Sequence, residues 1–125
     1  MKSLEFDSYY EVLALHKSLM AVKFDKNRCL PEAQGSPYTA TLALKVFDLL
    51  VEFSKNEGKL SQADEWLAWQ IADESRIETG LLLQHISNAD WWKSSSEEQK
   101  EKYIANFMAP LKLNSKVKDE IIRNS

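Results

Sequence analysis

Residues 36–58 read SPYTATLALKVFDLLVEFSKNEG, and this stretch decides the fold class. Serine followed by proline is typical of a helix start, because serine caps free backbone amides and proline in the first turn loses no hydrogen bond. The polar side chains fall on one narrow line of such a helix, and apolar side chains cover most of the remaining surface. Gly58 marks the end of the pattern. The stretch therefore predicts a helix over 37–56 at the centre of the hydrophobic core.

Apolar residues recur at spacings of three and four on both sides of this stretch, and no segment alternates like a half-buried strand. Three such segments follow candidate helix caps, namely Asp7 or Ser8, Ser61, and Ser95 or Ser96. Pro31 and Gly35 interrupt the pattern and indicate a loop. We predict a loop over 25–36 and helices over about 8–23, 37–56, 62–75, 77–87, 96–109 and 115–123.

Three glycines and three prolines in 125 residues are fewer than a sheet protein of this size needs at its turns. We therefore predict an all-α fold, a single compact domain of five to six helices packed as an orthogonal or irregular bundle. The sequence leaves open whether 62–87 forms one helix or two. The longest mostly apolar stretch is too short and too charged to cross a membrane. A single cysteine and the lack of a visible export signal predict a cytoplasmic protein.

The formal charge of −3 is unevenly distributed along the chain. Residues 1–45 carry six basic and five acidic side chains, residues 46–90 carry three and nine, and residues 91–125 carry seven and five. The middle of the chain is therefore acidic, and Arg76 is the only basic residue in 60–92. This charge favours a basic partner and disfavours nucleic acid, whose phosphates require basic side chains.

Four tryptophans are many for a chain of this length, and they occur in two pairs. Neighbours in sequence cannot both point into one core, so at least one of Trp91 and Trp92 should be partly exposed. Exposed tryptophan beside acidic side chains is typical of a protein-binding surface. A wide core contact and a pocket for a small apolar ligand are the alternatives. The candidate interaction surface comprises Trp66, Trp69, Trp91, Trp92, Asp73, Glu74 and Glu78.

Residues 71–87 read IADESRIETGLLLQHIS and resemble the helix-turn-helix motif of bacterial DNA-binding proteins. Ala72 matches the small position where two helices cross, and Ile77 and Leu82 match two apolar positions. The sequence departs from the motif where Arg76 replaces the usual glycine of the turn and where the second helix lacks basic residues. What the resemblance implies is a dimeric transcriptional regulator whose candidate DNA-contacting residues are Arg76, Thr79, Gln84 and His85.

Three potential metal ligands occur close together in the sequence, namely Glu74, Glu78 and His85. They share one face only if 62–87 is a continuous helix. Carboxylates on a solvated helix face explain the two glutamates equally well. We expect no metal and no cofactor.

Cys29 is the only candidate nucleophile of the thiol class. The adjacent Arg28 would lower the pKa of the thiol, and His16 could act as its base. No third orienting group occurs at a recognisable spacing, and neither a phosphate-binding loop nor a catalytic serine motif is present. We expect no catalytic residue and predict that the protein is not an enzyme.

The hypothesis from the sequence is a small cytoplasmic helical protein that acts by protein–protein contact. The contact would be self-association, as in a homodimer, or binding through an acidic surface like that of an adaptor or inhibitor. A helix-turn-helix transcriptional regulator using residues 71–86 is the alternative.

Overall fold

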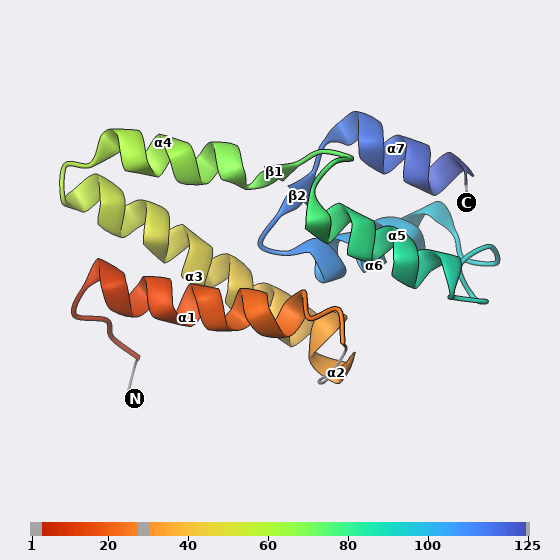
Figure 1. The fold of residues 1–125 in the computed structure, drawn as a ribbon, viewed down its shortest axis with the longest axis horizontal. Helices are drawn as coiled ribbons and strands as arrows, with labels where there is room; N and C mark the ends of the chain where they lie inside the picture. The colour runs from red at the N-terminus through yellow and green to blue at the C-terminus, as the bar shows by residue number, and fades with distance from the viewer. Residues whose placement is uncertain (1–3, 28–30, 125) are drawn as a thin grey trace.

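Seven α-helices and one pair of short strands make up residues 4–27 and 31–124, the part of the chain that the computed structural model describes (Figure 1). The predicted all-α fold is confirmed. The elements are α1 Tyr9–Lys23, α2 Pro31–Gln34, α3 Pro37–Asn56, α4 Leu60–Trp69, β1 Ile71–Ala72, α5 Ile77–Ser87, α6 Glu97–Met108, β2 Lys112–Leu113 and α7 Ser115–Asn124.

The structure contains one helix more than the sequence predicted. The additional helix is α2, a single turn inside the predicted loop 25–36. Pro31 occupies its first position, where the fixed φ of proline suits a helix and its missing N–H costs no hydrogen bond. Because a four-residue helix has almost no periodicity, the hydrophobic pattern does not reveal it.

Side-chain caps begin α1, α3 and α6 where the sequence indicates them. The Ser8 hydroxyl accepts from the Glu11 N–H, and Ser36 accepts from two amides at the start of α3. Ser96 and Gln99 form a reciprocal capping box. Local hydrogen bonds thus define these starts, which explains why the sequence locates them to within one residue.

The connection between α3 and α4 is tighter than the sequence predicted. Gly58 has a φ of 77°, and the Lys59 N–H donates to the Ser54 carbonyl at 2.8 Å. These contacts close the end of α3 in a Schellman-type turn, and α4 follows at once. The expected cap at Ser61 is wrong, because α4 begins at Leu60 without a side-chain cap.

The predicted helix 62–75 is also too long at its other end, since α4 stops at Trp69. Ile71 and Ala72 instead form β1, which pairs in parallel with Lys112 and Leu113 of β2. The Gln70 side chain adds a hydrogen bond to the Pro110 carbonyl at 3.0 Å. The expectation that no strand occurs is wrong for a non-local reason, because β1 pairs with a segment about 40 residues further along the chain.

Helix α3 packs against α1, α4 and α6 and contributes buried residues to the two hydrophobic clusters of the N-terminal half, but none to the cluster of the C-terminal half, so it is central to only part of the core. Figure 1 shows α1–α4 forming one half of the molecule and α5–α7 the other, with β1 and β2 between them. The N-terminal half buries Val12, Phe47 and Leu50, and the C-terminal half has its own hydrophobic cluster around Trp92 and Phe107. None of the described helices is both long and apolar enough to cross a membrane.

Candidate functional site

The structure separates the four tryptophans into two different environments. Trp66 and Trp69 lie on α4, whereas Trp91 and Trp92 lie in the turn that follows α5. Trp91 is 46% exposed and Trp92 only 2% exposed, so one member of this pair is exposed, as predicted. Trp91 packs its ring against Tyr103 at 4.9 Å and keeps an outer surface available for contact.

Trp92 belongs to the core and not to a surface, which corrects its place in the predicted interaction surface. It packs in the cluster with Leu82, Ile104 and Phe107. The Lys100 ammonium lies over its ring at 5.2 Å, and the buried indole N–H has no hydrogen-bond partner among the described residues. A substitution of Trp92 would therefore change the stability of the fold, and it would not test partner binding.

Trp66 and Trp69 are half-buried and form an aromatic cluster with His16 and Phe47. Trp69 stacks on Phe47, while Trp66 is nearly perpendicular to both rings. His16 lies within 5.3 Å of both indoles, and its burial lowers its pKa, with a further contribution from Lys17. A neutral imidazole is thus the form that suits this cluster, consistent with its place on the apolar side of α1.

A hollow of about 280 Å³ opens beside this cluster, between α1 and α4. Its lining residues are Tyr9, Gln62, Glu65, Trp66 and Trp69, and we call it the aromatic hollow. The Trp66 indole N–H donates to the Tyr9 hydroxyl at 3.0 Å, which holds one wall in place. Glu65 is exposed and forms no ion pair within the described residues.

The acidic residues after β1 are partly neutralised by Arg76. The Arg76 guanidinium donates to the Trp69 carbonyl at 2.8 Å, pairs with Glu78 at 3.3 Å and lies 5.2 Å from the Trp69 ring centroid. Asp73 accepts from the hydroxyl and the amide of Ser75, and these hydrogen bonds lower its pKa, the hydroxyl contributing most. Arg76 and Glu78 therefore serve the local structure, while Asp73 and Glu74 stay exposed.

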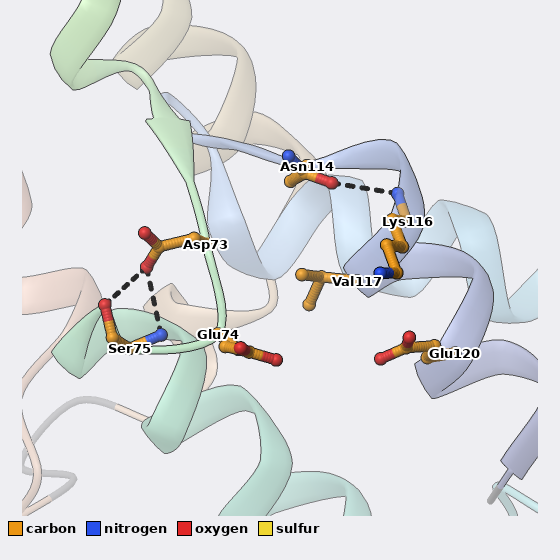
Figure 2. Close-up of a pocket in the computed structure, with 7 residues that line it drawn as sticks. All are labelled: Asp73, Glu74, Ser75, Asn114, Lys116, Val117 and Glu120. Carbon is orange, nitrogen blue, oxygen red and sulfur yellow. Dashed lines mark hydrogen bonds between the residues drawn. The ribbon is translucent and has the colours of Figure 1, made fainter.

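Figure 2 shows a second hollow, formed where the loop 73–75 faces the start of α7. Glu74 and Glu120 point into it from opposite sides, with Val117 between them. Across the described residues, no group of three or more His, Cys, Asp or Glu side chains is placed to hold a metal ion. The geometry needed for ligation by Glu74, Glu78 and His85 is not met, because Glu74 precedes α5 and no continuous helix joins it to His85.

Residues 71–86 do not form a helix-turn-helix. Ile71 and Ala72 lie in a strand, and Ile77, expected to pack beneath the turn, is 81% exposed. Of the candidate DNA-contacting residues besides Arg76, Thr79 is buried and donates to the Asp73 carbonyl, and His85 packs against Phe107. Gln84 is exposed. The four side chains therefore do not form one polar surface.

The proposed thiol–imidazole pair involves residues that fall partly outside the described structure. Cys29 and Arg28 lie outside the described residues. His16 lies inside the aromatic cluster described above.

The sequence reasoning missed an exposed apolar stripe on α4. Leu60 and Leu67 are 63% and 42% exposed, and Ile71 of β1, beyond the end of the helix, is 50% exposed. Asp64 lies between the two leucines and is also exposed. We call Leu60, Asp64 and Leu67 the α4 stripe. Its spacing of i, i+4 and i+7 was the available signal, since residues at these positions share one helix face.

No family model matches this chain, and no curated protein or solved structure is significantly similar to it.

Proposed function

We propose that this is a cytoplasmic protein that acts without catalysis, by binding a basic partner protein through the α4 stripe. The observation that carries the proposal is two leucines exposed on one face of α4, with the Asp64 carboxylate between them forming no ion pair with any described residue, and the exposed Ile71 following the helix. Exposed apolar residues that occur singly need no explanation, whereas an aligned group of them is typical of a contact surface. From Leu60 to Leu67 the stripe spans about 10 Å, or about two helical turns.

Charge supports a basic partner in particular. Asp64 and Glu65 are exposed on α4, and Asp73 and Glu74 follow β1. Arg76 is the only basic residue in 60–92, and it is already bound to Trp69 and Glu78. Lys59, at the start of α4, is paired with Glu57, and Lys112 lies beside Ile71 in the strand pair. Carboxylates thus predominate on α4 and in the loop after β1, and complementary charge on a partner would speed and orient docking.

The same negative charges disfavour a second copy of this chain as the partner that binds the α4 stripe. Two copies docked stripe to stripe would bring both Asp64 carboxylates to one interface. The chain offers no basic residue from position 60 to 75 to compensate for this repulsion. Juxtaposed like charges are costly at an interface, so we favour a different protein as the partner.

Site-specific photo-crosslinking in the native cells tests the proposal. Leu67 is replaced by p-benzoylphenylalanine in one variant, and Leu42 of α3 is replaced in a control variant. The two leucines are matched in exposure, at 42% and 43%. We expect position 67, and not position 42, to crosslink a protein with a basic surface. Adding Asp64→Lys should lower the yield at least about fivefold, and raised salt should lower it as well.

Three outcomes would count against the proposal. They are equal crosslinking from both positions, an adduct between two copies of this chain, and a yield that Asp64→Lys leaves unchanged. A crosslink to nucleic acid in place of a protein would also contradict the proposal.

A further inference from the structure

We infer that the aromatic hollow is a binding site for the guanidinium group of an arginine side chain on another molecule. The site is separate from the α4 stripe. Gln62, Glu65, Trp66 and Trp69 are spaced i, i+3, i+4 and i+7 and share one flank of α4. The stripe lies about half a helical turn away from that flank, at roughly 100° per residue. The inference therefore does not depend on the partner proposed above.

The walls of the hollow have the chemistry that attracts a cation. Trp66 and Trp69 both line it, with ring centroids 5.4 Å apart and planes at 85°. Phe47 stacks on the Trp69 ring and Arg76 lies over it, so the aromatic surface that would receive a further cation is that of Trp66, whose negative π-face attracts a cation within about 6 Å. Glu65 adds a full negative charge at the same place and forms no ion pair with any described residue.

The walls are also held in position before any ligand arrives. The Trp66 N–H is hydrogen-bonded to Tyr9, and Trp69 is stacked on Phe47 at a ring distance of 5.9 Å. Burial keeps the neighbouring His16 neutral by lowering its pKa, so the imidazole does not repel a cation at neutral pH. A preformed site loses less entropy when it binds.

Arginine fits the hollow better than lysine does. The guanidinium is planar, stacks on aromatic rings and carries five N–H donors in a fixed fork. The hollow offers acceptors of matching type in the Glu65 carboxylate and the Gln62 side-chain carbonyl. Within the same molecule, the Arg76 guanidinium already lies over the Trp69 ring at 5.2 Å, and Arg76 does not line the hollow. No basic residue is found among the lining residues, and Arg76 already occupies the Trp69 ring, so a bound guanidinium would contact Trp66, Gln62 and Glu65.

The experiment is an NMR titration of the full chain with capped amino acids, followed through the tryptophan indole N–H signals. The probes are N-acetyl-arginine methylamide, its neutral isostere N-acetyl-citrulline methylamide, and N-acetyl-lysine methylamide. We expect capped arginine to shift the Trp66 indole signal in a saturable way, with at least about fivefold weaker binding for citrulline. Trp91, in the other half of the molecule, provides an internal control signal that should not move.

Two matched variants locate the effect. Glu65→Gln removes the charge from an exposed position and should weaken arginine binding about fivefold, whereas Glu98→Gln, an exposed carboxylate on α6, should leave it unchanged. Trp66→Phe should also weaken arginine binding. Glu65→Gln changes an exposed side chain and does not disturb the core, so it tests the inference even if the Trp66→Phe variant does not fold.

Equal binding of arginine and citrulline, tighter binding of lysine, or insensitivity to Glu65→Gln would each overturn the inference. These results would leave the α4 stripe untouched, since the crosslinking test uses residues outside the hollow.

Discussion

Lys23 shows how one residue connects the two halves of the molecule. It is the last residue of α1, its side chain is fully buried, and its ammonium donates to the Asn106 carbonyl of α6 at 2.8 Å. Asn106 lacks its usual helical partner, because the residue four positions later is Pro110, which has no N–H. A lysine at a helix C-terminus also interacts favourably with the helix dipole. Lys23 thus donates a hydrogen bond to the Asn106 carbonyl, which has no backbone N–H donor four residues later.

Lys23 should make stability depend on pH. Burial lowers its pKa to about 8 from the ordinary 10.5. Between these two values the unfolded chain binds a proton that the folded chain does not, so the free energy of unfolding rises as pH rises from 8 to 10.5. The total gain is at most about 3 kcal/mol. Below pH 8 the folded and the unfolded chain both hold the proton, so the contribution of Lys23 to the free energy of unfolding is at its lowest and no longer changes with pH.

Urea unfolding at a series of pH values from 7 to 10 measures this effect. Lys23→Met should remove most of the rise, whereas Lys17→Met, an exposed lysine on the same helix, should preserve it. An identical pH profile in wild type and Lys23→Met would contradict the prediction.

At the scale of elements, two glycines have opposite roles. Gly58 ends α3 with a φ of 77°, a backbone conformation that residues with a side chain rarely adopt. Gly80 lies inside α5, where glycine only adds flexibility. A methyl group would meet no atom within 4 Å at either position. The difference between them is therefore one of backbone conformation and not of packing.

Replacing each glycine by alanine should shift stability in opposite directions. Gly58→Ala should lower the free energy of unfolding by about 1–2 kcal/mol, because it forces a left-handed alanine. Gly80→Ala should raise it by about 0.5–1 kcal/mol, because alanine favours the helix. Thermal or urea unfolding measures both, and shifts of the same sign would contradict the prediction.

On the scale of the whole molecule, the contacts between the two halves hold them together as one body. Phe24, the residue after α1, packs against Phe107 of α6 at 5.9 Å, and Trp69 touches the hydrophobic clusters of both halves. The β1–β2 pair and the hydrogen bond from Gln70 to Pro110 join the chain just after α4 to the chain just after α6. These links should make unfolding cooperative.

We predict that both halves unfold in one transition. The indole signals of Trp66 and Trp92 report on different halves, and they should disappear at the same urea concentration. Gln70→Met removes a buried donor, leaves the Pro110 carbonyl without it, and should cost about 1–3 kcal/mol. Both signals should move together in this variant. Gln84→Met, at an exposed site, is the control, and separate midpoints for the two indoles would contradict the prediction.

Local chemistry made part of this structure readable from the sequence alone. The all-α class, the span of α3 and α5, the caps at Ser8 and Ser96 and the stop at Gly58 depend on residues within about four positions of one another. The prediction that one of the adjacent tryptophans is exposed rests on equally local geometry.

Only the tertiary structure decided which surfaces are available for function. The burial of Trp92, the end of α4 at Trp69 and the neutralisation of Arg76 follow from packing that local pattern does not specify. The partner of Lys23 is 83 residues away, and that of Gln70 is 40 residues away. The sequence by itself therefore determined the helical class and most helix ends, because helices form from near neighbours. The α4 stripe and the aromatic hollow emerged only from the structure, because the exposure of a side chain depends on which distant segments pack beside it.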